Sequence, residues 1–251
     1  DTSQRIAQAL REKGVDIIPR ASIESVKTNK TETTCELSGP KERSVNVKKI
    51  LVSNRIPNTS GLGLKKIGIR LNEDNGIRVN DRLESSVEGI YAIGDATGGW
   101  MLSHAASSMA VFAAENAMGA KKRYPFNLIP RCLWTQPEMG AVGLSEEDAE
   151  KQGYDVETGV FPYAINGLAM VRNEVDGAVK IVSDARYGEI LGVHIVGSNA
   201  TELAGEAVLA MQLEATAQEL ARSIRVHPTF SEAVVDAARD ANNWALYLPR
   251  S

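Results

Sequence analysis

The chain has 251 residues, of which 43% are apolar and 24% are charged. This composition belongs to a globular protein with material for one or two hydrophobic cores, and it excludes a disordered or fibrous chain. The formal net charge of −4 and the lack of clustered Lys and Arg argue against a nucleic-acid surface, because phosphate binding depends on such clusters.

Membrane, export and metal-binding signals are missing from the sequence. No apolar run reaches the roughly 18 to 20 residues that cross a bilayer. The opening residues Asp1 to Gln4 lack the charged leader and apolar segment of a signal peptide, and no Met precedes them, so we expect a piece of a longer chain. Cys35 and Cys132 are too far apart in sequence for a disulfide framework or a zinc site, so no metal is predicted. A reduced, cytoplasmic setting is expected.

The first part of the chain is predicted to be one helix followed by strands. Apolar residues recur at helical spacing over residues 2–13, and Gly14 suits the left-handed position that ends a helix. A helix followed only by strands is typical of the tail of a larger α/β domain. The predicted strands, divided by Pro, Asn and Gly residues, cover residues 15–18, 22–28, 33–37 and 45–52.

The middle of the chain is predicted to contain a turn-rich segment at 58–63, strands at 76–79 and 89–93, and a helix at 101–118. That helix is rich in Ala and Ser, which permits close backbone approach, and Gly119 is its expected end. A linker at 121–130 leads to a third region with its own core.

The third region alternates strands and helices. Ser145 is predicted to cap a helix whose first turn is acidic. The segments 178–183 and 190–196 are rich in Val and Ile and flank a polar turn, so they predict a hairpin. The remaining predicted strands are 139–144 and 156–163, and the remaining helices are 200–213, 217–222 and 231–246.

Gly94 and Asp95 follow the strand predicted at 89–93, which we expect to be buried, and precede the helix predicted at 101–118. A glycine permits close approach of a ligand, and an aspartate at the carboxyl end of a strand can accept hydrogen bonds from ligand hydroxyls. The helix entered at Met101 would direct unsatisfied amides toward an electron-rich group. The alternative is a strand, a turn and a core helix with no ligand.

His227 and Glu232 form a second candidate site. Histidine is the natural proton carrier near neutral pH, and a carboxylate on its other ring nitrogen fixes the tautomer, which suits thiol chemistry. The alternative is a helix capping box, with Thr229 as N-cap and Glu232 reaching back to it.

Several segments of the chain, including the one that contains Gly94 and Asp95, resemble the flavoprotein disulfide oxidoreductases in both order and spacing. His227-Pro-Thr followed by Glu232 resembles the active-site base of the dihydrolipoamide dehydrogenase and glutathione reductase types. The resemblance covers nearly the whole chain but only about the last half of the family's length. The other matching segments are 55–58, 61–64, 90–95, 101–104 and 114–116.

The resemblance implies roles for particular residues. Asp95, after Gly94, would bind the flavin ribityl chain, and Met101, Leu102, Ser103 and His104 would lie along the flavin, largely through backbone groups. His227 would be the catalytic base and Glu232 its orienting acid, serving the flavin and redox cysteines of the other subunit of a homodimer. The His227-Pro228 peptide bond is expected to be cis. His194 is expected to be a satisfied core or interface histidine.

The resemblance further implies a mixed α/β and α+β fold in three parts. Residues 1–56 would be the tail of an NAD-binding Rossmann-like domain, 57–127 the C-terminal part of the FAD-binding domain, and 128–251 an α+β dimerisation domain. The intact enzyme would use FAD and NAD to oxidise dihydrolipoamide on the lipoyl domain of a 2-oxo acid dehydrogenase or glycine cleavage complex. The chain alone is expected to be inactive and to bind FAD weakly, since the dinucleotide glycine motifs and the redox cysteine pair are missing from it.

The sequence also departs from the family. Asn54 replaces a common glycine near the nicotinamide, and Trp100 and Ala110 replace commoner residues near the flavin helix. Glutathione, trypanothione and mercuric reductases are same-class alternatives, although the segment 231–233 and the ending 244–249 favour the lipoamide type. A non-catalytic dimerisation module is the alternative of a different class.

Overall fold

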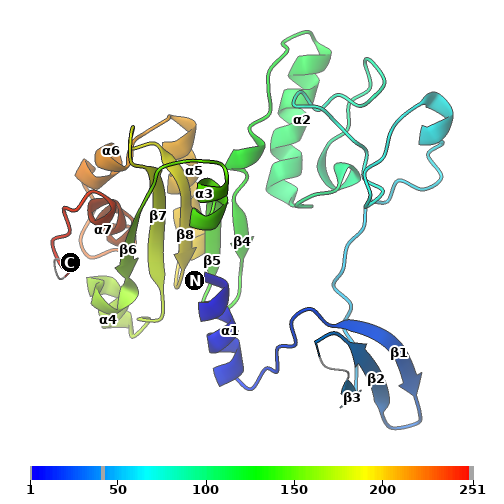
Figure 1. The fold of residues 1–251 in the computed structure, drawn as a ribbon, viewed down its shortest axis with the longest axis horizontal. Helices are drawn as coiled ribbons and strands as arrows, with labels where there is room; N and C mark the ends of the chain where they lie inside the picture. The colour runs from blue at the N-terminus through cyan, green and yellow to red at the C-terminus, as the bar shows by residue number, and fades with distance from the viewer. Residues whose placement is uncertain (1, 41–42, 249–251) are drawn as a thin grey trace. The chain divides into compact units, whose positions relative to one another are not determined.

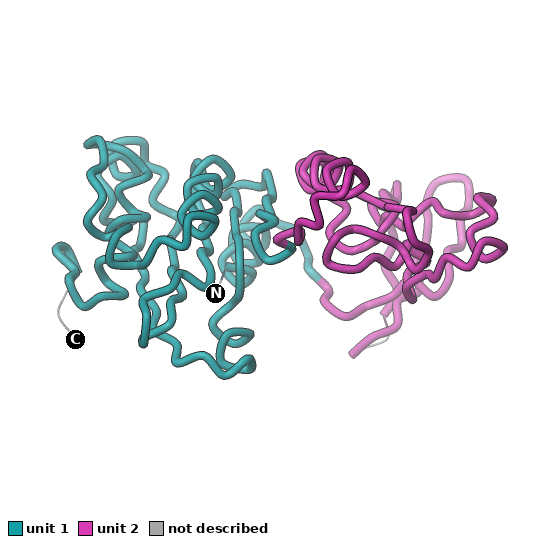
Figure 2. Tube along the Cα trace, turned by 90° about the horizontal axis from the view of Figure 1, so that it is seen from above, with its two compact units in different colours: residues 1–17, 126–251 teal, residues 18–125 magenta. Residues whose placement is uncertain are grey.

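The computed structural model describes residues 2–40 and 43–248, and it divides into two compact units. Unit 1 comprises residues 1–17 and 126–251, and unit 2 comprises residues 18–125 (Figure 2). Within the described ranges, no helix combines the length and the apolar character needed to cross a membrane.

Unit 2 begins with a three-stranded antiparallel sheet in the order β1-β2-β3 (Figure 1). The turn between the first two strands is stabilised by Asn29, whose Oδ1 accepts hydrogen bonds from the amides of Thr31 and Glu32, both at 2.9 Å. The strands are β1 (Ser22–Thr28), β2 (Thr33–Ser38) and β3 (Arg43–Val47).

The rest of unit 2 is built from loops, two short 3-10 helices and one 15-residue α-helix, and it contains a small core of Ile69, Ile77 and Ala92. The buried amide of Asn116 donates to the carbonyls of Arg82 and Lys122 and accepts from the Lys122 amide, so it fastens the helix end to the surrounding loops. The helices are η1 (Leu64–Ile67), η2 (Gly94–Thr97) and α2 (Ser103–Ala117).

Unit 1 contains a five-stranded antiparallel sheet in the order β4-β5-β8-β7-β6 (Figure 1). Two of its inner strands, β7 (Ala178–Asp184) and β8 (Ile190–Val196), form the predicted hairpin. The other strands are β4 (Arg131–Leu133), β5 (Met139–Gly143) and β6 (Val156–Pro162).

The main core of unit 1 lies between one face of this sheet and α5, α6 and α7, where Val193 and Ile195 of β8 are almost completely buried. A smaller cluster, Ala149, Val182 and Leu191, includes a residue of α3. The helices are α1 (Thr2–Glu12), η3 (Phe126–Leu128), α3 (Glu146–Lys151), η4 (Tyr163–Ile165), α4 (Gly167–Arg172), α5 (Ala200–Gln212), α6 (Ala217–Arg222) and α7 (Glu232–Ala241).

The predicted mixed α/β architecture and most predicted elements of unit 1 are confirmed. Ser145 caps α3 by accepting the Asp148 amide at 3.1 Å, as its sequence context indicates. The structure also contains β4 and α4, which the sequence pattern did not predict. The division of the chain into 1–56, 57–127 and 128–251 stays a prediction.

Three predicted strands, at 15–18, 76–79 and 89–93, are wrong: the first has no regular secondary structure, and the other two make only isolated bridges. A strand needs a hydrogen-bonded neighbour along its length, and no such neighbour lies beside these segments among the described residues. Two further elements are shorter than predicted, since β3 ends at Val47 and α7 ends at Ala241.

Candidate functional site

The His227 ring stands at the entrance to α7 in unit 1. Its Nδ1 lies 2.9 Å from Oε1 of Glu232, the first residue of the helix. The second carboxylate oxygen, Oε2, accepts the Thr229 amide at 2.8 Å. Both sequence interpretations are therefore realised in part, because Glu232 gives one oxygen to the imidazole and the other to the chain before the helix.

The predicted capping box is incomplete. Thr229 Oγ1 donates to the Val226 carbonyl at 2.7 Å, and Ser231 occupies the N-cap position without a side-chain cap. The His227-Pro228 peptide bond is cis, as predicted.

Burial differs sharply between the two members of the pair. The His227 side chain is 74% exposed, whereas Glu232 is 24% exposed. Because Nδ1 faces the carboxylate, the other ring nitrogen, Nε2, is the one available to an incoming group. A neutral ring that donates from Nδ1 to Glu232 has an unprotonated Nε2, so the arrangement can accept a proton there.

The predicted flavin-side residues gather in unit 2 around the start of α2. Gly94 has φ 60°, and a Cβ on it would lie 2.8 Å from the Cβ of Ala106 in α2. Leu102, which has no polar side-chain atom, stands at the N-cap, so this residue leaves the first-turn amides without a side-chain cap. Ser103 and His104 occupy that first turn.

Arg55 links two of these residues, a contact that the sequence reasoning missed. Its guanidinium pairs with the half-exposed Asp95 carboxylate, and its Nη1 donates to the Met101 carbonyl at 2.7 Å. Met101 itself has φ 47°, a left-handed conformation that is uncommon for a non-glycine residue. The only sequence signal for Arg55 was its place in the segment 55–58.

These residues fit the flavin end of an FAD molecule. Close packing of Gly94 on α2 brings the Asp95 turn beside the helix start, where dipole and amides favour an electron-rich group. Asp95 is the one carboxylate of the set, and its oxygens can accept hydrogen bonds from ligand hydroxyls when they are released from the Arg55 guanidinium.

The other predicted residues behave as structural groups. His194 Nε2 lies 2.8 Å from the Leu144 carbonyl, and burial, together with Arg131 and Lys180, lowers the pKa of its ring. Cys35 is buried in β2 and Cys132 half-buried in β4, and neither forms a disulfide. Across the described ranges, no group of three or more His, Cys, Asp or Glu residues is placed to hold a metal ion.

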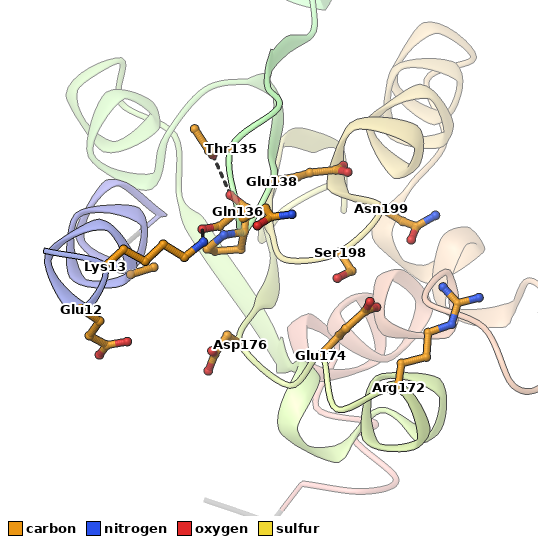
Figure 3. Close-up of a pocket in the computed structure, with 12 residues that line it drawn as sticks. Glu12, Lys13, Thr135, Gln136, Glu138, Arg172, Glu174, Asp176, Ser198 and Asn199 are labelled. Carbon is orange, nitrogen blue, oxygen red and sulfur yellow. Dashed lines mark hydrogen bonds between the residues drawn. The ribbon is translucent and has the colours of Figure 1, made fainter. Parts of the chain in front are cut away.

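A polar pocket of about 540 Å³ in unit 1 was not anticipated from the sequence. Figure 3 shows Glu12, the last residue of α1, and Lys13, which follows it, on one side, and Arg172 and Asn199 on the other. Lys13 Nζ donates to the Gln136 carbonyl at 3.0 Å, which ties α1 to the loop before β5. Half of the residues that line the pocket are charged, and most of these are exposed to solvent, so we assign it no chemistry.

Comparison with known protein families shows the family to which this chain belongs. Residues 1–110 match the family described as pyridine nucleotide-disulphide oxidoreductase, and residues 129–238 match the dimerisation domain of the same family. The chain belongs to the pyridine nucleotide-disulphide oxidoreductases. The second match covers the five-stranded sheet and includes His227 and Glu232.

Relatives within this oxidoreductase family include the dihydrolipoyl dehydrogenases of Thermus scotoductus and Corynebacterium glutamicum, each 37% identical to this chain. The matches cover 99% and 95% of this chain but 54% and 52% of the relatives. The chain thus spans about half the length of the curated relatives it matches.

Solved structures of similar fold include LpdA from Mycobacterium tuberculosis, with a TM-score of 0.84 and 29% identity over 94% of this chain and 52% of that one. The HOCl-induced flavoprotein disulfide reductase RclA from Escherichia coli, in a Cu(II) complex, has a TM-score of 0.81 and 26% identity over 95% of this chain and 54% of that one.

Proposed function

We propose that this chain is the carboxyl-terminal part of an FAD- and NAD-dependent dihydrolipoamide dehydrogenase. The observation that carries the proposal is the His227–Glu232 pair, an exposed imidazole held at Nδ1 by a largely buried carboxylate. The identity to dihydrolipoyl dehydrogenases supports the substrate class.

His227 would act on a thiol of dihydrolipoamide. Its Nε2 accepts the thiol proton as the sulfur attacks a disulfide, because the thiolate is the nucleophile in thiol–disulfide exchange. Glu232 stabilises the imidazolium that results and keeps the ring in one orientation. In the complete reaction the dithiol loses two electrons and two protons, and NAD⁺ becomes NADH with release of one proton.

When bound, FAD would supply the two-electron relay between the dithiol–disulfide centre and NAD. Asp95 would hold its ribityl hydroxyls, with Gly94 allowing the close approach, and the backbone of Met101, Leu102, Ser103 and His104 would face the flavin ring. Binding requires the Asp95 carboxylate to exchange its Arg55 partner for ligand hydroxyls.

The proposed assembly is a homodimer in which His227 and Glu232 serve the reaction centre of the neighbouring subunit. The match to a dimerisation domain and the exposure of the His227 ring support this arrangement. The proposed macromolecular substrate is the lipoyl domain of a 2-oxo acid dehydrogenase or glycine cleavage complex.

A chimeric enzyme tests the function. The amino-terminal half of the Thermus scotoductus relative is joined to this chain, and stoichiometric FAD content is the criterion for correct assembly. We expect the chimera to reduce NAD⁺ with dihydrolipoamide. His227→Gln should lower kcat by about 10² to 10⁴, the range for removal of a general base, and Glu232→Gln should lower it less.

The substrate comparison separates the rival functions. Faster NADPH-dependent reduction of glutathione disulfide, trypanothione disulfide or mercuric ion than NAD⁺ reduction by dihydrolipoamide would replace the lipoamide assignment by the corresponding reductase. A chimera that binds FAD fully and turns over none of these substrates would leave a dimerisation module as the function of this chain.

A further inference from the structure

Asn166 forms a hydrogen bond to the loop that carries His227, although it belongs to a different segment of the chain. It is the N-cap residue of α4 and is only 3% exposed. The Asn166 Oδ1 accepts the Ala169 amide at 3.0 Å and so caps α4. Its Nδ2 donates to the Thr229 carbonyl at 3.0 Å. One partner is a donor and the other an acceptor, so the orientation of the amide is fixed by its surroundings.

Thr229 connects Asn166 to the candidate base, His227, through Glu232. Its carbonyl is held by Asn166, and its amide donates to Glu232 Oε2 at 2.8 Å. The other oxygen of Glu232 is the partner of the His227 ring. A continuous set of hydrogen bonds therefore runs from Asn166 through Thr229 and Glu232 to the imidazole.

Packing strengthens the same connection. A Cβ on Gly167 would lie 3.4 Å from His227 Cε1, so the backbone at this glycine borders the ring. Phe230 stacks on Tyr163 with ring centroids 5.2 Å apart, and the Arg172 guanidinium lies 5.8 Å from the Phe230 centroid. The segment from η4 to α4 thus supports the loop at several points.

We propose that Asn166 is a positioning residue for the His227–Glu232 pair. The inference rests on the function proposed above, and Asn166 acts through Thr229 and Glu232 without touching substrate. Its Nδ2 donor keeps the Thr229 peptide in the orientation that lets Glu232 divide its two oxygens between the loop amide and the ring. Loss of that donor frees the peptide and weakens the contact between Glu232 and Nδ1.

The tautomer of His227 tests the proposal in the chain itself. Side-chain ¹⁵N NMR of the histidine-labelled chain reports which nitrogen of each neutral ring carries the proton. The chain has three histidines, and His227→Gln assigns the relevant signals. We expect neutral His227 to be protonated mainly at Nδ1, because Glu232 accepts a hydrogen bond there.

Two substitutions remove the Nδ2 donor in different ways. Asn166→Asp keeps the shape and the cap on α4, and Asn166→Ser keeps a capping oxygen but is uncharged and too short to reach the Thr229 carbonyl. In either variant the ratio of Nδ1-protonated to Nε2-protonated ring should fall about tenfold, because the charge-assisted hydrogen bond between Nδ1 and Glu232 is weakened. If the aspartate variant does not fold, the serine variant decides.

Ser145→Ala is the matched control. It removes the N-cap of α3, another six-residue helix of unit 1, and it should lower stability while leaving the His227 tautomer unchanged. An equal change of tautomer in this control would overturn a specific role for Asn166, since general loosening would then be the cause.

The remaining outcomes separate this inference from the function on which it rests. Wild-type His227 protonated mainly at Nε2 would remove the pair itself and both proposals with it. Wild-type His227 protonated at Nδ1, with the same ratio in both folded Asn166 variants, would overturn the positioning role alone.

Discussion

The surroundings of Cys132 change the pKa of its thiol. Burial raises the pKa of its thiol, and Glu138 and Glu202 raise it further because a thiolate beside carboxylates is disfavoured. At pH 8 the thiol is therefore mostly protonated and slow to react. Glu202 is exposed on the first turn of α5, so its charge can be removed without disturbing the core.

We predict that Glu202→Gln accelerates alkylation of Cys132 by iodoacetamide at pH 8 by about twofold, because loss of a negative charge lowers the thiol pKa. Mass spectrometry of the Cys132 peptide measures the rate separately from Cys35. Glu150→Gln, on α3, is the charge-matched control and should leave the rate unchanged. A slower rate in Glu202→Gln would contradict the electrostatic cause.

Prediction from sequence succeeded for residues whose partners lie close in the chain. The spacing of His227 and Glu232 brought them into one pair, and the acidic turn after Ser145 marked a cap. The contacts of Arg55 and Asn166 were not predicted. Arg55 contacts Met101, which is 46 residues away, and Asn166 contacts Thr229, which is 63 residues away. No local pattern specifies contacts at such separations.

In unit 1, helix α7 packs closely against strand β6. Gly159 of β6 faces α7, where a Cβ would lie 2.1 Å from the Ala237 carbonyl oxygen and 2.2 Å from the Ala241 nitrogen. Both neighbours are backbone atoms, so they cannot move aside as a side chain does. Any side chain at Gly159 must displace the helix that begins with Glu232.

We predict that Gly159→Ala lowers the free energy of unfolding by about 3 kcal/mol, the upper range for overpacking. Gly205, inside α5, has open space where a Cβ would stand, with no atom within 4 Å, so Gly205→Ala should raise it by about 1 kcal/mol through helix propensity. Urea unfolding measures both. Equal effects of the two substitutions would refute the close approach at β6.

Predicted strands were confirmed where a neighbouring strand pairs with them along their length. The segments 178–183 and 190–196 were predicted as a hairpin and pair as β7 and β8. The segments 76–79 and 89–93 were also predicted as strands but form only isolated bridges among the described residues. Composition gives a segment its tendency to be a strand, whereas hydrogen-bonded neighbours make it one.

On the scale of the whole molecule, sequence order and spatial grouping differ at the beginning of the chain. The helix at the start was predicted with the strands that follow it, yet α1 belongs to unit 1, where Lys13 contacts the loop before β5. Such grouping depends on surfaces formed by distant segments, so periodicity along the helix could not indicate it.

The surface of unit 1 beside His227 carries apolar side chains suited to a subunit contact. Ile224 is 95% exposed, and Val226 and Tyr247 are also well exposed. Ile224 and Tyr247 line a pocket together with Glu232, so this surface is continuous with the proposed catalytic pair. Exposed apolar residues grouped in this way are typical of interaction sites.

If the homodimer places this surface in contact with its mate, Ile224→Asp should weaken the dimer by about 100-fold, since the change removes apolar burial and desolvates a charge. Analytical ultracentrifugation across a range of chain concentrations measures the dissociation constant, and circular dichroism checks the fold. Met118→Asp, at a position in unit 2 that is 89% exposed, should leave the constant unchanged. A wild-type chain that stays monomeric at every concentration, or an Ile224→Asp chain that dimerises as tightly as the wild type, would exclude this surface as the site of contact.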